Sequence, residues 1–376
     1  MSFVVPGCQC CHKKITHRII SDAGSMIWSK RDTNSNVGGD VNRSCGIALS
    51  KDPGLAWTVT GKTIGSVPSP LVQWDGTGAI TDTTTLPESV SAGANGRQVV
   101  ASDASGNIYI GHYATTSHET IVKLDSSLNE VWRFVSPGHA GSRTAYYSWG
   151  IAVKPDDSRI ASITYLQKTG YVIQGRIAEH DPSDGSELWS LTYYPTDIAV
   201  AGGVETYIPV YTHYDPSGKL WVGFHASITV GGVGSGVWAR FDSSGNIDRL
   251  VDFSSSATAE ELLAFDSAGD VYVFRDSGSG GQVKQYSDTG TLLNTWSSEV
   301  TPSSSPAYKG FEIDPNDNLY LFGYHGALLP RLTCYQTDGT KNWHYEETKS
   351  SLASAGFWNI YSNDGYVGIA GPLRRA

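Results

Sequence analysis

The chain has 376 residues, with 27 Lys and Arg against 37 Asp and Glu, and a formal net charge of −10. This acidic balance, without a Lys/Arg-rich run, disfavours binding to nucleic acid through phosphate contacts. No stretch of about 18 apolar residues predicts a membrane span. The N-terminus has a short apolar run without a basic lead, so no secretory signal is predicted.

The first 45 residues hold four of the five cysteines, Cys8, Cys10, Cys11 and Cys45. Cys8 to His12 fit the Cys-x-x-Cys-His pattern of haem c attachment, which requires export and maturation. Together with His12, the four cysteines also offer ligand types for a tetrahedral zinc site, although their spacing is not that of a known finger. The third interpretation, which the sequence favours, is free thiols or disulfides that tie a tail, residues 1–14, to the domain that follows.

A short strand, a small polar turn and a second strand recur along the chain. Four clear copies occupy residues 101–110, 214–222, 265–273 and 313–321. Including weaker copies, the turns follow at intervals of about 50 residues, with one step near 60, at Asp52, Asp103, Pro155, Asp215, Asp266, Asp314 and Asn363. A period of 40 to 50 residues made of four short strands is typical of a β-propeller blade.

A second hairpin completes the repeat. Its copies at residues 122–132, 179–189, 240–247, 284–296 and 334–343 have Asp, Ser and Gly in the turn, as a tight hairpin requires. Tryptophan recurs on the strand after this turn, and we expect the rings to pack between neighbouring blades: Trp28, Trp132, Trp189, Trp296 and Trp343.

The two ends of the chain each carry half a repeat. Residues 18–28 form a second hairpin without a first, and residues 357–370 form a first hairpin without a second. Joined, they complete a blade and remove the open sheet edges. The sequence therefore predicts an all-β domain, residues 15–376, folded as a seven-bladed β-propeller that is closed by pairing of its N- and C-terminal strands.

Strand order in such a ring has consequences for the polar residues. We expect Cys45 just before a first strand, so Cys45 and the tail would lie on the same face of the ring. His112, His225 and His325 follow second strands and would lie on that face too. We interpret them as residues that end strands and bond loop backbone, because no acidic partner recurs beside them. Cys334, within a strand, is predicted to be a small buried apolar residue.

The hairpin Asp181 to Trp189 resembles the tryptophan-containing repeats of the quinoprotein superfamily, which read Asp-x-x-x-Gly-x-x-x-Trp. The resemblance implies a propeller and, in that family's dehydrogenases, a redox activity with a vicinal disulfide against the quinone. Cys10 and Cys11 are a vicinal pair, but they lie in the tail, and no catalytic residue of the family can be matched. The repeat also resembles propeller proteins found among bacteriophage virion (tail) proteins.

No catalytic motif stands out. The carboxylate pairs Asp156–Asp157, Asp181–Asp184 and Glu260–Glu261 fall in turns or loop starts. We therefore expect a non-enzymatic structural and interaction propeller, a phage tail or capsid-attached component made in the host cytoplasm, that binds protein partners or a surface glycan. The alternatives are a cytoplasmic interaction platform and an exported quinoprotein-like redox or carbohydrate-active enzyme that acts at the channel mouth.

Overall fold

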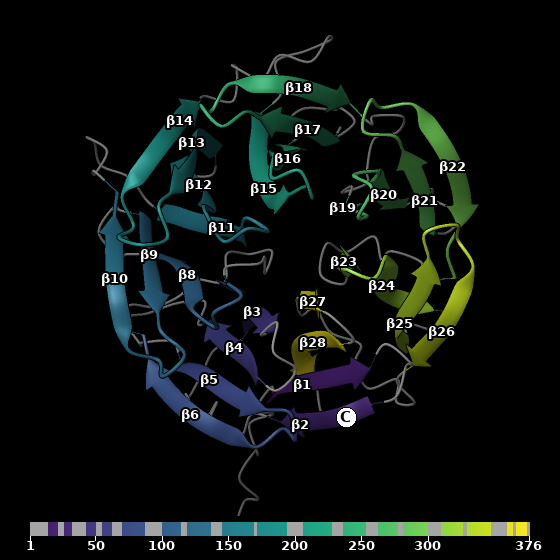
Figure 1. The fold of residues 1–376 in the computed structure, drawn as a ribbon, viewed down its shortest axis with the longest axis horizontal. Coiled ribbons are helices and arrows are strands. Elements are labelled where there is room, and N and C mark those ends of the chain that lie inside the picture. The colour runs from purple at the N-terminus through teal and green to yellow at the C-terminus, as the bar shows by residue number, and fades with distance from the viewer. Residues whose placement is uncertain are drawn as a thin grey trace, which may run out of the picture.

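The computed structural model describes residues 14–21, 26–31, 43–49, 55–61, 70–86, 100–113, 119–136, 145–168, 171–193, 206–227, 236–252, 262–276, 281–299, 310–325, 329–346, 359–363 and 366–373. Every regular element within these ranges is a β-strand. The strands form four-stranded antiparallel sheets arranged around a central axis (Figure 1). The prediction of an all-β propeller is therefore confirmed.

Six sheets, blades 1 to 6, are each built from four consecutive strands. Blades 1 and 2 comprise β3 (Arg43–Leu49), β4 (Leu55–Gly61), β5 (Pro70–Asp75), β6 (Ile80–Thr85), and β7 (Val100–Ser102), β8 (Ile108–Tyr113), β9 (Glu119–Leu124), β10 (Glu130–Val135). Blades 3 and 4 comprise β11 (Ala145–Val153), β12 (Ile160–Lys168), β13 (Tyr171–His180), β14 (Glu187–Tyr193), and β15 (Thr206–Tyr214), β16 (Leu220–Ser227), β17 (Gly236–Phe241), β18 (Ile247–Asp252). Blades 5 and 6 comprise β19 (Leu262–Phe265), β20 (Val271–Asp276), β21 (Gly281–Tyr286), β22 (Leu292–Ser297), and β23 (Gly310–Ile313), β24 (Asn318–His325), β25 (Leu329–Gln336), β26 (Lys341–Glu346).

A further sheet, the composite sheet, combines strands from both ends of the chain. It holds β1 (Lys14–Ser21), β2 (Met26–Arg31), β27 (Asn359–Asn363) and β28 (Tyr366–Leu373) in the order β2-β1-β28-β27. β1 and β28 pair antiparallel from Lys14 opposite Leu373 to Ser21 opposite Tyr366. β27 contacts β23 of blade 6 and β3 of blade 1.

Each blade runs outward from the central axis. Its first strand lies nearest the centre, as β11, β15, β19 and β23 do, and its fourth strand, such as β10, β14, β18 or β22, lies at the periphery (Figure 1). The apolar cores within the described residues form between consecutive blades: for example, one cluster joins Val100 and Ile108 of blade 2 to Trp57 and Leu71 of blade 1. Each blade is thus stabilised mainly by its neighbours, as in other repeat proteins.

A buried aspartate organises the turn between the first and second strands. Asp103 accepts hydrogen bonds on Oδ1 from the backbone N–H groups of Ser105 and Asn107, both at 2.9 Å. Its Oδ2 accepts from Asn107 Nδ2 at 2.7 Å and from the buried Tyr109 hydroxyl at 2.9 Å. Gly106 closes the turn with φ +78°, a conformation that glycine adopts without strain.

The same arrangement recurs in three other blades. There too, the aspartate binds an aromatic residue six positions on, in the pairs Asp215–Trp221, Asp266–Tyr272 and Asp314–Tyr320, at 2.9 to 3.0 Å. The turn carboxylates predicted from the repeat are therefore structural groups whose oxygens accept bonds from the turn and from the adjacent strand.

Tryptophans on the fourth strands contact the next blade. Trp132 of blade 2 donates its indole N–H to the carbonyl of Pro182 at 3.0 Å and packs on Gly185, both in the outer turn of blade 3. The predicted packing between blades is confirmed for three rings, which contact turn glycines of the following blade in the pairs Trp132–Gly185, Trp189–Gly245 and Trp296–Gly339. The side chain of Trp28 lies outside the described residues.

Buried ion pairs also join blades. Glu119 of blade 2 pairs with Arg176 of blade 3, and both side chains are less than 9% exposed. Glu179 of blade 3 pairs with Arg159 and accepts hydrogen bonds from Trp189 Nε1 at 2.7 Å and from the Tyr214 hydroxyl of blade 4 at 2.8 Å. Because such carboxylates are fully engaged with partners, their removal would leave buried donors unpaired.

Candidate functional site

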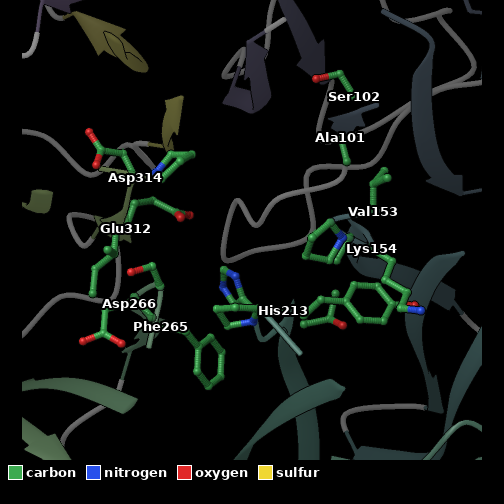
Figure 2. A pocket seen from close by; sticks show the side chains of 18 of the residues that line it. Ala101, Ser102, Val153, Lys154, His213, Phe265, Asp266, Glu312 and Asp314 are labelled. Carbon is green, nitrogen blue, oxygen red and sulfur yellow. The ribbon is translucent and has the colours of Figure 1, made fainter. Parts of the chain in front are cut away.

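A central cavity of about 450 Å³ opens among the first strands of blades 2 to 6. Its wall is made by the ends of β7, β11, β15, β19 and β23 and by the turns that follow four of them. Pockets for small molecules typically measure about 300 to 1,000 Å³, so the cavity has the size of a ligand site. Figure 2 shows side chains from opposite walls that project into this space.

Two polar residues interrupt a row of alanines around the cavity. The residue two positions before the turn is alanine in blades 2, 3 and 5, namely Ala101, Ala152 and Ala264, and all three line the cavity. Blade 4 has His213 at this position and blade 6 has Glu312 (Figure 2). The backbone place is the same, since His213 pairs with Trp221 and Glu312 with Tyr320 just as Ala264 pairs with Tyr272.

Burial changes the protonation of both groups. Desolvation in the cavity raises the pKa of Glu312 from 4.5 to about 8 and lowers the pKa of His213 from 6.5 to about 4. Near pH 7 both side chains are therefore mainly neutral. A carboxyl group and an imidazole that are held neutral can each donate and accept a hydrogen bond, and strongly shifted groups in a cleft often mark functional sites.

A third polar group lies on the same wall as His213. Thr212 lines the cavity and is 5% exposed, and its hydroxyl has no hydrogen-bond partner within the described residues. Buried hydroxyls are usually paired, but this oxygen has less than 1 Å² of accessible surface, so it is not open to a molecule in the cavity.

The rim of the cavity carries further charges. Asp157, Asp266 and Asp314 lie in the turns, and Lys154 is the basic residue of the lining, with its ammonium 3.1 Å from Asp156. Burial raises the pKa of Asp266, against the hydrogen bonds that its carboxylate accepts. The cavity wall is therefore acidic overall.

The sequence-predicted metal and haem residues are not tested by this structure. Cys8, Cys10, Cys11 and His12 lie outside the described residues, as does the side chain of Cys45. The backbone of Cys45 corrects one expectation, because it lies within β3 rather than before it, at a bulge between Ser44 and Gly46 where the register with β4 shifts. Among the described residues, no three His, Cys, Asp or Glu side chains gather as metal ligands.

Other predicted positions have mixed outcomes. Cys334 in β25 is fully buried, which confirms the predicted burial, and its sulfur accepts a hydrogen bond from Asn342 Nδ2 at 3.8 Å. Asp181 accepts hydrogen bonds from the backbone N–H and the hydroxyl of Ser183, which confirms the turn role predicted for Asp181. The side chains of His112, His225 and His325 at the ends of β8, β16 and β24 lie outside the described residues, as do Glu260 and Glu261.

His213 and Glu312 were missed from the sequence, although a signal was present. When the turns are aligned, the clear copies read Ala-Ser-Asp at 101–103, His-Tyr-Asp at 213–215, Ala-Phe-Asp at 264–266 and Glu-Ile-Asp at 312–314. A histidine and a glutamate at a position where alanine suffices for the fold distinguish the two residues from their equivalents.

No helix in the described part of the chain meets the length and hydropathy that a bilayer span requires. The fold and its central cavity define the protein as a β-propeller with a pocket among its inner strands.

Comparison with known proteins supports this class and no narrower one. No protein-family model matches the sequence, and no curated protein matches it. The structure is similar to a puromycin hydrolase mutant, with 12% identity and a TM-score of 0.57 over 86% of this chain and 49% of that chain. The chain thus spans about half the length of that hydrolase.

Two further structures are similar in fold. The WD40 domain of Toxoplasma gondii coronin has 10% identity and a TM-score of 0.51, with 90% of this chain and 83% of that chain covered. A quinohemoprotein alcohol dehydrogenase from Pseudomonas putida HK5 has 12% identity and a TM-score of 0.47, with 93% and 70% covered, too low to carry an argument. At these identities the likeness shows the fold alone, and this fold serves enzymes and binding scaffolds alike.

Proposed function

We propose that this protein is a non-enzymatic propeller that binds a protein partner through its outer strands and holds that partner in a larger assembly. The observation that carries the proposal is a belt of exposed aliphatic side chains on the fourth strands of blades 1 to 5. The belt consists of Ile80, Val131, Val135, Leu188, Ile247, Leu250, Leu292 and Leu293, each 45 to 52% exposed.

Several features of the belt favour protein recognition. Its members come from β6, β10, β14, β18 and β22, the strands at the periphery of the ring (Figure 1). On β22 two leucines stand next to each other and are both about half exposed. A partner that covered these side chains would remove their apolar area from water, at about 25 cal/mol per Å². In blade 6 the first residues of the outer strand are instead Lys341 and Asn342.

The test replaces both leucines of β22 with glutamate, Leu292→Glu and Leu293→Glu, in the protein expressed in its native source. We expect the wild type to migrate in a large complex with chemical crosslinks to β22, and the variant to be released as free protein with an unchanged melting temperature. Thr295→Glu, an exposed polar position on the same strand, is the control and should keep the complex. If the leucine variant keeps the complex and the same crosslinks, the proposal is wrong.

We propose a bacteriophage virion as the setting, with this chain as a tail or capsid-attached component made in the host cytoplasm. What supports this is the resemblance of the repeat to phage virion propellers. Mass spectrometry of density-purified particles tests it: the chain should be present at a fixed ratio to the major capsid protein. Its absence from such particles would favour a cytoplasmic platform, and binding to host glycans in place of a protein would assign the partner differently.

We also propose that the composite sheet acts as a seventh blade and closes the ring into a rigid scaffold. The pairing of β1 with β28 and the contacts of β27 with blades 1 and 6 support it. Deletion of residues 366–376 should then lower the urea midpoint of the whole domain. A deletion variant that unfolds as the wild type does would contradict closure.

A further inference from the structure

The central cavity contains two polar side chains that the fold does not require. Ala101, Ala152 and Ala264 occupy the same place in three blades, and those blades form their turns and strand pairs with alanine. A buried titratable group destabilises a protein unless it is paired. The cost of placing His213 and Glu312 here therefore points to a role other than folding.

Neither side chain is engaged by another residue in the described part of the protein. Within the described residues, no hydrogen bond or ion pair involves the carboxyl of Glu312 or the imidazole of His213, and burial alone accounts for their shifted pKa values. Both are partly exposed to the cavity, and Figure 2 shows them projecting into it from β23 and β15.

The charge of the wall selects among ligand classes. Glu312, Asp157, Asp266 and Asp314 contribute carboxyl groups, whereas the ammonium of Lys154 is paired with Asp156 outside the lining. A concave acidic wall of low dielectric concentrates cations. Since no three metal-ligand side chains gather in the described part of the chain, an organic cation, which needs one counter-charge and a few acceptors, fits better than a metal ion.

We propose that the central cavity binds a small organic ammonium ion, with the Glu312 carboxylate as its counter-charge and with His213 as a hydrogen-bond acceptor for one of its N–H groups. The site is separate from the outer belt and does not depend on the partner proposed there. The cavity volume of about 450 Å³ limits the ligand to a small molecule.

Binding of this kind is coupled to proton release. Free Glu312 is protonated below its pKa of about 8, and an ammonium ion favours the carboxylate, so the ligand displaces that proton into solvent. Among the described side chains, the other titratable groups on the strands and turns packed against β23 are Asp266 and the bonded pair Asp314 and Tyr320. None of them is placed to replace Glu312 as the counter-charge, because the carboxylates of both aspartates accept bonds within their turns.

His213 keeps one protonation state during such an experiment. Its pKa of about 4 leaves the imidazole neutral from pH 6 to 9, so it can accept an N–H group without repelling the cation. The affinity should therefore rise about tenfold per pH unit between pH 6 and pH 8 and level off above, as expected when one proton is released per ligand.

Isothermal titration calorimetry of the full-length protein tests the proposal with n-butylammonium, 1-butanol and butyrate as probes. We expect n-butylammonium to bind, the neutral and anionic probes not to bind, and titrations in phosphate and MOPS at pH 6.5 to report release of about one proton per ligand. Glu312→Gln should weaken binding at least about tenfold and abolish proton release. Glu130→Gln, an exposed carboxyl on β10, should change neither.

Glu312→Ala provides a second variant, because alanine is the native residue at this place in other blades and the fold accepts it. It should also lose binding while its circular dichroism spectrum stays that of the wild type. The proposal is overturned if n-butylammonium does not bind at millimolar concentration, if it binds Glu312→Gln as tightly as the wild type, or if 1-butanol binds equally well.

Discussion

Replacement of the turn aspartate of blade 2, Asp103→Ala, removes an acceptor of four hydrogen bonds at a position that is 5% exposed. The main loss comes from Tyr109, whose buried hydroxyl would have no partner at a cost of about 1 to 3 kcal/mol. The turn amides can be solvated in part, which adds about 1 kcal/mol. We expect the free energy of unfolding to fall by about 3 kcal/mol.

A double-mutant cycle separates the buried bond from the turn. Tyr109→Phe alone should cost about 1 kcal/mol, because it removes a donor while Asp103 keeps its other bonds. In the Asp103→Ala background, however, Tyr109→Phe removes an orphaned hydroxyl and should be neutral or stabilising, which gives a coupling energy of about 1.5 kcal/mol. Urea denaturation gives these free energies, and hydrogen exchange at the Asn107 amide reports the opening of the turn.

Asp125→Ala in the outer turn of the same blade is the matched control. Asp125 also accepts backbone bonds, from Ser127 and Asn129 at 2.9 Å, but these bonds are exposed and no buried hydroxyl depends on them. Its loss should be clearly smaller than that of Asp103. If the two alanine variants are equally destabilised, or if Asp103 and Tyr109 are additive within about 0.5 kcal/mol, the buried bond does not organise the blade.

Three further outcomes follow from the same geometry. Gly185→Ala should lower the free energy of unfolding by about 2 kcal/mol more than Gly269→Ala, in thermal or urea unfolding. Both glycines have positive φ, but only at Gly185 would the added Cβ lie 2.6 Å from a ring carbon of Trp132. Equal losses would argue against the packing between blades. Because the native state keeps a proton on Glu312 up to about pH 8 that the unfolded chain loses near pH 4.5, the contribution of Glu312 to stability falls as pH rises between these values. Glu312→Ala should therefore stabilise the protein by on the order of 4 kcal/mol at pH 8 and little at pH 4; a gain independent of pH would contradict the shifted pKa. Asp317 has φ +60° and accepts two hydrogen bonds of 2.7 Å from the turn of blade 5. Asp317→Ala should therefore destabilise the protein by about 1 kcal/mol more than Asp317→Gly, because only glycine adopts this φ without strain. The opposite order of melting temperatures would contradict this prediction.

Much of the fold could be predicted because its turns are specified by residues that lie close together in the sequence. The turn at 103–106 is specified by an aspartate that bonds its own backbone and by a glycine that adopts positive φ, and both are visible in the printed sequence. Repetition of that turn gives the sheets, and the recurrence of tryptophan gives the contact between blades, as Trp132 on Gly185 shows.

The position of Cys45 could not be predicted in the same way. The sequence suggested that it precedes the first strand of blade 1, but a bulge lets β3 begin at Arg43 and carry one residue without a partner. A bulge inserts an extra residue at a point set by the pairing of two strands, so the pattern within one strand does not reveal it.

A repeated four-stranded unit, its turns and the apolar faces between the units follow from the printed residues alone, because each depends on residues a few positions apart. Only the tertiary structure brought His213 and Glu312 to one cavity, although 99 residues separate them in the chain. The tertiary structure also sets the protonation of both side chains, since a pKa depends on how many atoms surround the group and exclude water. That environment is created by the first strands of five blades together, and no single repeat contains it.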